Sequence, residues 1–390
     1  MSEVFVIEAV RTPIGRFRGS LSGVRADHLT AALLTELVKR SGIKPTDVED
    51  VVFGCVTQVG EQSTNVARTG LLSAGWSESI PGMTVDRKCG SGEAAVQTAA
   101  AEIAAGVYDV VIAGGAESMS RVPMGSNRSL HGEPFGFMLT DQYEMTSQGE
   151  SAERVAERWS FNREMIDDYA IESHRRAAAA ADAGFFAREI VPIDTSIYQE
   201  RSYEIPGGVV DADETIRRDT SRERLSGLKP AFRQDGKITA GNSSQIADGA
   251  AALLLMSKQA VKRMGVRPRA RIVSMAAIGS DPTLMLTGPV KASRKALAKA
   301  GLTTDDVDLF EVNEAFAPVP MMWMTEMGLD HERLNVNGGA ISLGHPLGAT
   351  GARIMTSLLY ELQRRGARYG LQAICCAGGQ GTATIIEALS

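Results

Sequence analysis

The sequence predicts an α/β fold built from two similar halves. Apolar segments of strand length alternate with helical segments through much of the 390 residues, a pattern typical of buried sheets covered by helices. Residues 42–48 resemble residues 301–307, and each copy follows an amphipathic helix and precedes a strand. Residues 117–237 differ in character and interrupt the alternation. These observations predict a duplicated α/β unit with one large insertion.

The individual elements follow from apolar periodicity and from the turn residues that bound each segment. The strands expected in the first half are Val4–Ile7, Val51–Gly54, Val110–Gly114 and Ala251–Met256, and the helices are Ala26–Arg40 and Cys89–Gly106. The second half is expected to have strands at Leu309–Val312, Leu371–Ile374 and Thr382–Ala388.

The two copies of the repeat are 259 positions apart, the separation of Asp47 and Asp306. The same shift places Cys89-Gly90-Ser91-Gly92 over Gly348-Ala349-Thr350-Gly351, and each of these segments opens a predicted helix. Independent use of similar turn residues is the alternative explanation. We favour a duplication with a pseudo-twofold axis, because the register holds without a gap.

The insertion is expected to cover the functional site. Residues 127–143 are rich in turn and aromatic residues and predict a loop, whereas Ser151–Trp159 and Glu164–Ala183 predict helices. The domain division that follows is an N-terminal half of residues 1–116 and 238–267, an insertion of residues 117–237, and a C-terminal half of residues 268–390.

Composition excludes several classes of protein. The net charge of −6 argues against general binding of nucleic acid, and no apolar run approaches the ~20 residues of a membrane span. The start of the chain reads as a strand and lacks the pattern of a signal peptide. Four cysteines in a chain of this size do not form a disulfide framework, and none shows metal-ligand spacing. We therefore expect free thiols, a cytoplasmic location and no metal.

Cys89 is the first candidate for chemistry. It directly precedes a helix, and a helix N-terminus favours a thiolate. Gly90 and Gly92 would allow backbone to approach a substrate. A small buried residue is one alternative, and a dinucleotide-binding turn is another, because Gly90, Gly92 and Ala95 fit a loose fingerprint.

His345 is the second candidate. It lies between Gly344 and Pro346, just before the helix that mirrors the Cys89 helix. The other four histidines are weaker candidates for catalysis. His28, His174 and His331 lie in polar segments that we expect to be solvated, and His131 lies in the long loop. A packing or capping histidine is the alternative for His345.

Two further segments carry weaker signals. Cys375 and Cys376 end a predicted strand, and because strand side chains alternate, one should face the site and the other should face away. Periodicity does not decide between them, and either could be a small core residue. Asn313 follows the strand of the second repeat and offers an amide.

Taken together, these segments resemble the thiolase family across the whole chain. The resemblance rests on Cys89-Gly90-Ser91-Gly92, Asn313-Glu314-Ala315-Phe316, the Gly-His-Pro segment at His345, and Cys375. It implies a five-layer αβαβα fold of two duplicated halves with an inserted loop domain, assembled as a homodimer or homotetramer. It also implies acyl-CoA and CoA as substrates, with no permanently bound cofactor.

The resemblance implies a role for each residue. Cys89 would carry the acyl group, His345 would take its proton, and Cys375 would exchange the proton at the α-carbon of the acetyl unit. His345 and Asn313 would stabilise the enolate, and the backbone N–H groups of Cys89 and Ala377 would form an oxyanion hole. Positions matching the family's CoA contacts are Arg217, Ala231, Phe232, Ala240, Ser244, Gln148 and Phe316. Arg217 lies in a basic run whose other members are expected to be solvated.

Departures from the family pattern bear on the substrate. Ala377 stands where a glycine is common, and Asp86 stands where members of the biosynthetic type carry asparagine. Ser147-Gln148-Gly149 and Ser243-Ser244-Gln245 look more like the degradative type. We expect cleavage of 3-oxoacyl-CoA, with acetoacetyl-CoA synthesis as a second activity. The alternatives are a 3-oxoacyl synthase, a non-catalytic acyl-CoA or lipid carrier on the same scaffold and, as the weakest, a cysteine hydrolase.

Overall fold

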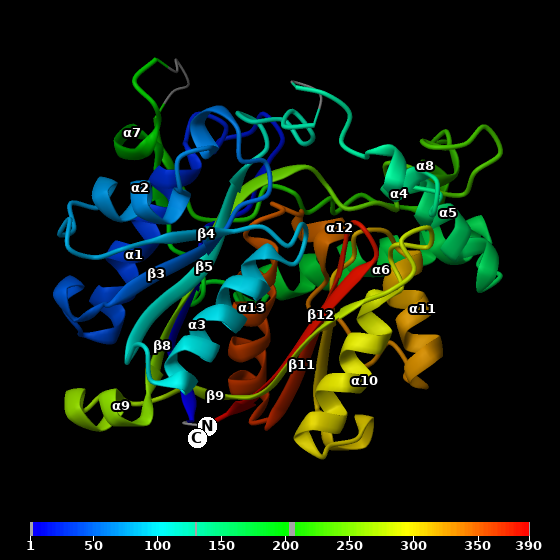
Figure 1. Cartoon of the computed structure of the whole chain (residues 1–390). Coiled ribbons are helices and arrows are strands. Elements are labelled where there is room, and N and C mark those ends of the chain that lie inside the picture. Colours follow the sequence, from blue (N-terminus) through cyan, green and yellow to red (C-terminus); the bar gives the residue numbers. More distant parts are fainter. Residues whose placement is uncertain (1–2, 129–130, 203–206, 390) are drawn as a thin grey trace.

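The computed structural model describes residues 3–128, 131–202 and 207–389, and its framework is one ten-stranded mixed sheet (Figure 1). The strand order is β4-β3-β5-β8-β1-β9-β12-β11-β10, with β2 beside β8. The strands are β1 (Val4–Arg11), β2 (Gly15–Arg16), β3 (Asp50–Gly54), β4 (Met83–Val85), β5 (Val110–Ser118), β8 (Ala247–Ser257), β9 (Ala270–Gly279), β10 (Leu309–Val312), β11 (Tyr369–Cys376) and β12 (Gln380–Ala388).

Helices divide the sheet into two arms. The arms join where β1 meets β9, through the pairs Phe5–Arg271 and Val6–Ala270. The helices of the two halves are α1 (Ala26–Ser41), α2 (Val66–Ser73), α3 (Ser91–Ala105), α9 (Lys258–Met264), α10 (Gly288–Ala300), α11 (Pro318–Met327), α12 (Ala340–Leu343) and α13 (Thr350–Arg365). Helices α3 and α13 lie between the arms, as Figure 1 shows.

Three hydrophobic clusters fill the spaces between the layers. One joins α1 and α2 to the outer face of the N-terminal arm, and another joins α10 and α11 to the outer face of the C-terminal arm. The third contains α3, α13 and the inner faces of both arms. Five layers in the order helix, sheet, helix, sheet, helix result, and the predicted αβαβα fold is confirmed.

The internal repeat is a structural duplication. Moving β3, α3 and β5 by 259 residues places them on β10, α13 and β11, with ends that agree to within one or two residues. The same shift superposes two short 3-10 helices, Pro45–Asp47 and Thr304–Asp306, and both carry a capping box. Two elements with the same cap at the same register are poorly explained by independent turn chemistry.

The two central helices touch where they begin. A Cβ atom on Gly92 would lie 2.6 Å from the carbonyl oxygen of Gly348, and one on Gly351 would lie 2.1 Å from the backbone nitrogen of Glu93. Real Cβ atoms do not approach so closely, so only glycine permits this backbone contact. The shift of 259 residues relates Gly92 to Gly351, so each helix contributes the equivalent glycine.

Residues 119–246 connect β5 to β8 and hold the remaining elements. These are α4 (Phe137–Thr140), α5 (Gln148–Arg158), α6 (Arg163–Asp182), α7 (Thr195–Tyr198), α8 (Arg222–Ser226) and the strand pair β6 (Ile193–Asp194) and β7 (Val209–Val210). Helix α5 contacts α11, and α6 contacts α12, so the insertion packs on the C-terminal half. The segment predicted as loop contains the single turn α4.

A buried ion pair holds the insertion to the sheet. The Arg11 side chain on β1 is fully buried; its Nε donates to Glu189 Oε1 at 2.6 Å, and its two terminal nitrogens donate to the Asp213 oxygens at 2.7 and 2.9 Å. Asp213 also accepts the backbone N–H of Ile14 at 2.8 Å. Both carboxylates come from the insertion, so Arg11 joins two parts of the chain that are distant in sequence.

We predict that Asp213→Asn destabilises the protein by about 3–5 kcal/mol, because it leaves a buried guanidinium without its bidentate partner. Urea denaturation followed by circular dichroism measures the change. Asp182→Asn is the matched control, since Asp182 pairs with Arg218 at the surface, and it should leave the urea midpoint unchanged. Equal midpoints for the two variants would contradict the role given to the Arg11 pair.

Candidate active site

Cys89 lies in the turn between β4 and α3. Lys88 adopts φ 51°, and Ser91 fixes the turn by accepting the Arg87 N–H at 2.8 Å and donating to the Lys88 carbonyl at 2.6 Å. The Cys89 side chain is 5% exposed and packs against Leu347 and Ile374, the neighbours in sequence of the Gly-His-Pro segment and of Cys375. The nucleophile candidate therefore sits where the other predicted segments meet.

Burial outweighs the helix start in setting the protonation state of Cys89. Burial raises the pKa of the Cys89 thiol to about 11, and the backbone N–H of Cys89 only partly opposes this shift. The negative charges of Glu117 and Asp86 raise the pKa further. Cys89 is therefore a neutral thiol at pH 7 and needs a base to react, as the expected role of His345 requires.

His345 is held in one orientation by its own loop. Its Nδ1 lies 2.6 Å from the Thr350 hydroxyl, and that hydroxyl donates its proton to the Pro346 carbonyl at 2.8 Å. Thr350 must therefore accept from Nδ1–H, which leaves Nε2 unprotonated. The backbone N–H of His345 donates to the Gln245 carbonyl at 2.9 Å. The hydrogen bonds select the tautomer that carries its lone pair at Nε2.

His345 is also neutral. Burial lowers the pKa of its imidazole to about 3, and the positive charge of Arg353 contributes to the shift. The side chain is 4% exposed. A neutral imidazole with an unprotonated Nε2 can accept a proton from a thiol, and the low pKa favours the return of that proton later in a reaction.

Asn313 lies directly beside the imidazole. It follows β10, its backbone N–H donates to the Ala373 carbonyl on β11 at 3.0 Å, and its Nδ2 lies 3.4 Å from His345 Nε2. The Asn313 Oδ1 atom is buried and accepts no hydrogen bond from the described residues. A buried acceptor without a partner is costly, which marks this side of His345 as a place for a polar ligand atom.

The two adjacent cysteines occupy different surroundings at the end of β11. Cys375 belongs to the buried cluster that contains Ala315 and Phe316 of the Asn-Glu-Ala-Phe segment. Cys376 lies against the first turn of α3, since a Cβ on Gly90 would be 2.6 Å from its sulfur. Burial raises the pKa of Cys375 well above its ordinary value, and charge on Cys89 raises it further. Charge on Cys89 raises the pKa of Cys376 as well, so both thiols at the end of β11 lie within electrostatic range of Cys89.

The predicted CoA contacts fall into two groups. Arg217 and Ala240 line a small pocket of about 120 Å³, and the Arg217 guanidinium donates to Gln245 Oε1 at 3.4 Å. The second group surrounds Phe232, whose ring meets that of Phe316 edge-on at 5.9 Å.

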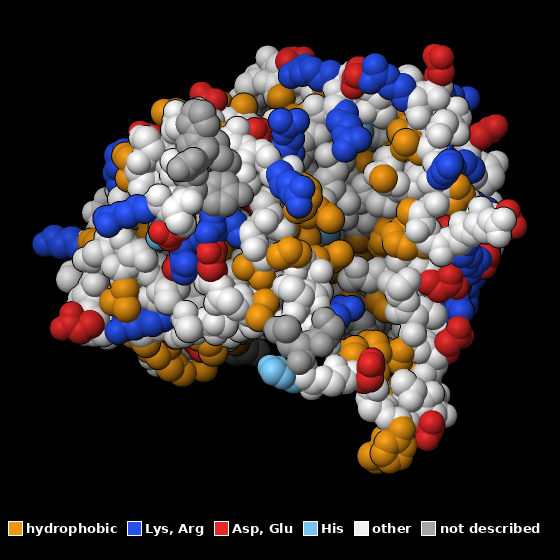
Figure 2. Space-filling model, turned by 90° about the horizontal axis from the view of Figure 1, so that it is seen from above, with side chains coloured by type: hydrophobic (Ala, Val, Ile, Leu, Met, Phe, Trp, Pro, Cys, Tyr) orange, Lys and Arg blue, Asp and Glu red, His pale blue; other side chains and the backbone are white. Residues whose placement is uncertain are grey.

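In this second group, Gln148 precedes Gly149, and a Cβ on Gly149 would overlap the Phe232 ring. Ala231 donates its N–H to Ile238, and Ser244 donates its N–H to Ala315. Figure 2, which looks onto this end of the molecule, shows hydrophobic side chains around a hollow, with Lys and Arg side chains on part of its rim.

His174 is buried, and the prediction that it is solvated was wrong. It is 4% exposed, and burial lowers its pKa to about 4. Its Nδ1 accepts the backbone N–H of Arg217 at 3.1 Å, so it supports the Arg217 pocket. His331 is half-buried and stacks on Tyr169 with ring centres 4.7 Å apart. Sequence polarity around a histidine did not indicate its burial.

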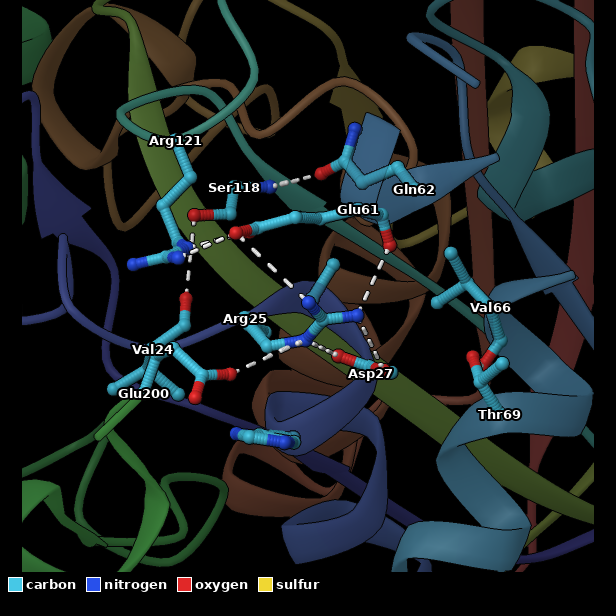
Figure 3. A network of polar contacts seen from close by, with 12 residues as sticks. Val24, Arg25, Asp27, Glu61, Gln62, Val66, Thr69, Ser118, Arg121 and Glu200 are labelled. Carbon is cyan, nitrogen blue, oxygen red and sulfur yellow. Dashed lines mark hydrogen bonds and ion pairs between the residues drawn. The ribbon is translucent and has the colours of Figure 1, made fainter. Parts of the chain in front are cut away.

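The sequence did not predict the buried contacts of several residues that shape the site. Glu117 and Glu314 are fully buried and accept backbone N–H groups from loops around Cys89 and His345. Gln62 supports Glu117 and also accepts the Ser118 N–H at 2.8 Å, next to an ion-pair network in which Arg121 binds Glu61 (Figure 3). A buried carboxylate leaves no periodic pattern, and the sequence offered no sign of these contacts.

Residues 3–128, 131–202 and 207–389 were searched for metal-ligand clusters and for membrane-spanning helices. No cluster of three or more His, Cys, Asp or Glu residues there could hold a metal ion. In the same ranges, no helix is long and apolar enough to cross a bilayer.

Both parts of the chain match known domain families. Residues 4–259 match the thiolase N-terminal domain, and residues 266–388 match the thiolase C-terminal domain. The chain is 45% identical to a steroid 3-ketoacyl-CoA thiolase of Mycobacterium tuberculosis, covering 100% of this chain and 95% of that protein. It is 44% identical to a beta-ketoadipyl-CoA thiolase of Pseudomonas putida, covering 99% of this chain and 100% of that protein.

A solved structure agrees with the sequence comparisons. The crystal structure of the Bacillus anthracis acetyl-CoA acetyltransferase matches with a TM-score of 0.91 and 42% identity, covering 100% of this chain and 99% of that one. Matches to both domain families over nearly the whole length, together with the duplicated five-layer fold, show that this chain belongs to the thiolase family.

Proposed function

We propose that the protein is a CoA-dependent acyltransferase that cleaves 3-oxoacyl-CoA to acetyl-CoA and a shortened acyl-CoA, and that also catalyses the reverse condensation. The observation that supports this proposal is a neutral, buried imidazole whose Nε2 lies 3.4 Å from Asn313 Nδ2, beside the unpaired Asn313 Oδ1. Cys89 belongs to one buried cluster with Leu347 and Ile374, which are close in sequence to His345 and Cys375. The full-length relatives named as thiolases and acetyltransferases support it.

The first half of the cleavage uses Cys89 and His345. Nε2 of His345 takes the Cys89 proton, and the sulfur attacks the 3-oxo carbon of the substrate. The bond between the α- and β-carbons then breaks, and the resulting enolate of acetyl-CoA takes a proton from the Cys375 thiol. Acetyl-CoA leaves, and the shortened acyl group stays on Cys89 as a thioester.

The second half restores the starting state. An incoming CoA thiol gives its proton to the Cys375 thiolate, and its sulfur attacks the acyl carbon on Cys89. The Cys89 thiolate leaves and recovers its proton from His345. The low pKa of His345 favours this return, and the high pKa values of both cysteines explain why both end the cycle as thiols. Protons and sulfur charges balance over the cycle.

Two negative oxygens need stabilisation during these steps. The protonated Nε2 of His345 and the neighbouring Asn313 would stabilise the enolate oxygen, directly or through a water at the unpaired Asn313 Oδ1. The backbone N–H groups of Cys89 and Ala377 would stabilise the tetrahedral oxyanion. Loss of one preorganised donor in such a site typically costs about 3 kcal/mol of transition-state stabilisation.

The insertion supplies the proposed binding site for CoA. Arg217 is exposed beside the small pocket that Ala240 lines, and a guanidinium suits a phosphate group. Phe232 is 45% exposed next to Gln148, Ala231 and Phe316 and would cover the pantetheine arm, with Ser244 below it. We therefore retain residues 117–237 as a loop domain between the halves 1–116 with 238–267 and 268–390, and we propose a cytoplasmic homodimer or homotetramer.

Cys89→Ala should abolish both thiolysis and condensation, because both directions of the proposed mechanism pass through an acyl group on Cys89. Intact-mass measurement after incubation with acetyl-CoA should show one acetyl adduct on the native protein and none on the variant. Cys55→Ala, at a buried cysteine that contacts Glu117, is the control and should keep the adduct. An acetyl adduct on the Cys89→Ala protein would contradict covalent catalysis by Cys89.

Cys375→Ala should separate the two chemistries. Acetylation of Cys89 by acetyl-CoA should remain within about tenfold of the native rate, because His345 handles the Cys89 proton, whereas carbon–carbon bond formation should fall by 10²–10⁴-fold as expected for loss of an acid–base group. Rapid-quench mass spectrometry and a condensation assay measure the two steps. Similar losses in both steps would refute the division of labour between the cysteines.

Substrate length should discriminate the degradative from the biosynthetic type. We expect kcat/KM for thiolysis at fixed CoA to be higher for 3-oxoacyl-CoA of six or more carbons than for acetoacetyl-CoA, since each added methylene that the protein buries contributes roughly 0.8 kcal/mol. Reaction with the four-carbon substrate alone would show that this protein is of the biosynthetic type.

A further inference from the structure

The segment that carries His345 is held at both ends by buried carboxylates. Four residues before His345, the Ile341 N–H donates to Glu314 Oε2 at 3.1 Å. Three residues after it, the Gly348 N–H donates to Glu117 Oε2 at 2.9 Å. Both glutamates are fully buried, and the proposed chemistry uses neither. Each therefore contacts the His345 segment through backbone and has no part in the reaction steps.

Glu117 links this segment to the N-terminal half. Its Oε2 also accepts the Val56 N–H at 2.9 Å, and its Oε1 accepts the Thr57 N–H at 2.9 Å and the Gln62 side-chain amide at 3.0 Å. One carboxylate oxygen thus bridges Val56, which packs in the Cys89 cluster, and Gly348 of the His345 segment. Because both hydrogen bonds end on one atom, the spacing between the two loops is fixed.

Glu314 links the same segment to the insertion. Its Oε1 accepts from the Tyr169 hydroxyl at 3.0 Å and from Asn335 at 3.1 Å, and its Oε2 accepts from the Ser173 hydroxyl at 2.7 Å. Tyr169 and Ser173 lie on α6, which packs on α12. Three parts of the chain, the two halves and the insertion, therefore meet on the short segment from Ile341 to Gly348.

Burying a carboxylate to make these hydrogen bonds has an unfavourable desolvation free energy. Burial is the largest influence on both groups and raises the pKa of Glu117 and of Glu314, while the N–H and O–H donors act in the opposite direction. Charge-assisted hydrogen bonds are shorter and roughly twice as strong as neutral ones, so they fix backbone more rigidly. A rigid His345 segment is what proton transfer at Nε2 requires, since a 1 Å displacement costs on the order of 10²-fold in rate.

We propose that Glu117 and Glu314 are positioning residues for His345, which hold its segment at the distance from Cys89 that proton transfer needs. This inference rests on the proposed function, because it assigns His345 as the base. Neither glutamate touches the substrate, and each acts through the backbone of the segment. Their removal should therefore lower the rate of the chemical step and leave substrate affinity in place.

A double-mutant cycle with His345→Ala tests the proposal, because coupling appears when two residues act as a unit. Glu117→Gln and Glu314→Gln are each made in the native and in the His345→Ala background. The rate of Cys89 acetylation by saturating acetyl-CoA is followed by rapid-quench mass spectrometry. Each glutamine variant should lose about 10²-fold in the native background and less than about threefold in the His345→Ala background, with KM for acetyl-CoA unchanged within about twofold.

Glu153→Gln is the matched control. Glu153 is also buried and also accepts backbone N–H groups, from Lys237 and Ile238, but it does not contact the His345 segment. It should lower the melting temperature without changing the acetylation rate. If Glu117→Gln does not fold, Glu314→Gln carries the test, because each Glu314 oxygen has one hydroxyl partner, from Tyr169 or Ser173, that can rotate to accept from an amide, whereas the backbone N–H donors to Glu117 cannot.

The outcomes separate this proposal from the proposed function. Equal fold-losses in both backgrounds, or no loss in the native background, would overturn the positioning role and leave the proposed function intact. Native acetylation rates in His345→Ala alone would instead refute His345 as the base. A large loss that disappears in the His345→Ala background supports the proposal.

Discussion

The close contact of two helix starts is the constraint on which the rest of the structure depends. Gly92 of α3 and Gly351 of α13 bring backbone against backbone, and Gly348 lies between them and the ends of β3 and β5. Any side chain at these positions would overlap the facing backbone and force the two halves apart. The loops that precede the helices carry Cys89 and His345, so the same contact sets how near the thiol and the imidazole can come.

Burial then decides the chemistry of these groups. A helix N-terminus favours an anionic sulfur, yet the surrounding apolar side chains and the nearby carboxylates keep Cys89 protonated in the free protein. His345 is driven toward its neutral form by the same dry environment. A thiol and an imidazole that are both neutral avoid a permanent buried ion pair, and in the proposed mechanism charge appears only when a substrate provides the acyl carbon that the sulfur attacks.

The sequence was most informative where local pattern and chemistry coincide. Segments around Asp47 and Asp306 predicted the duplication because short turn motifs keep their register, and β10 has the bounds that its apolar run indicated. The first four residues of β1 were predicted but its extension to Arg11 was not, and β5 continues beyond the predicted Gly114 through Gly115–Ser118, where strand propensity is low and pairing with β8 supplies the order.

The burial of polar groups could not be predicted from the sequence, because His174, Glu117 and Glu314 are enclosed by residues far away in the chain.

The duplication also has a chemical limit. Gly348 stands at the position equivalent to Cys89, and a Cβ there would lie 2.5 Å from the Gly54 carbonyl oxygen and 2.8 Å from that of Ala116. The second half has no space for a thiol of its own at that place. The twofold character of the scaffold therefore ends at the two helix starts: the first half carries Cys89 there, whereas the second half carries a glycine and holds His345 and Cys375 at other positions.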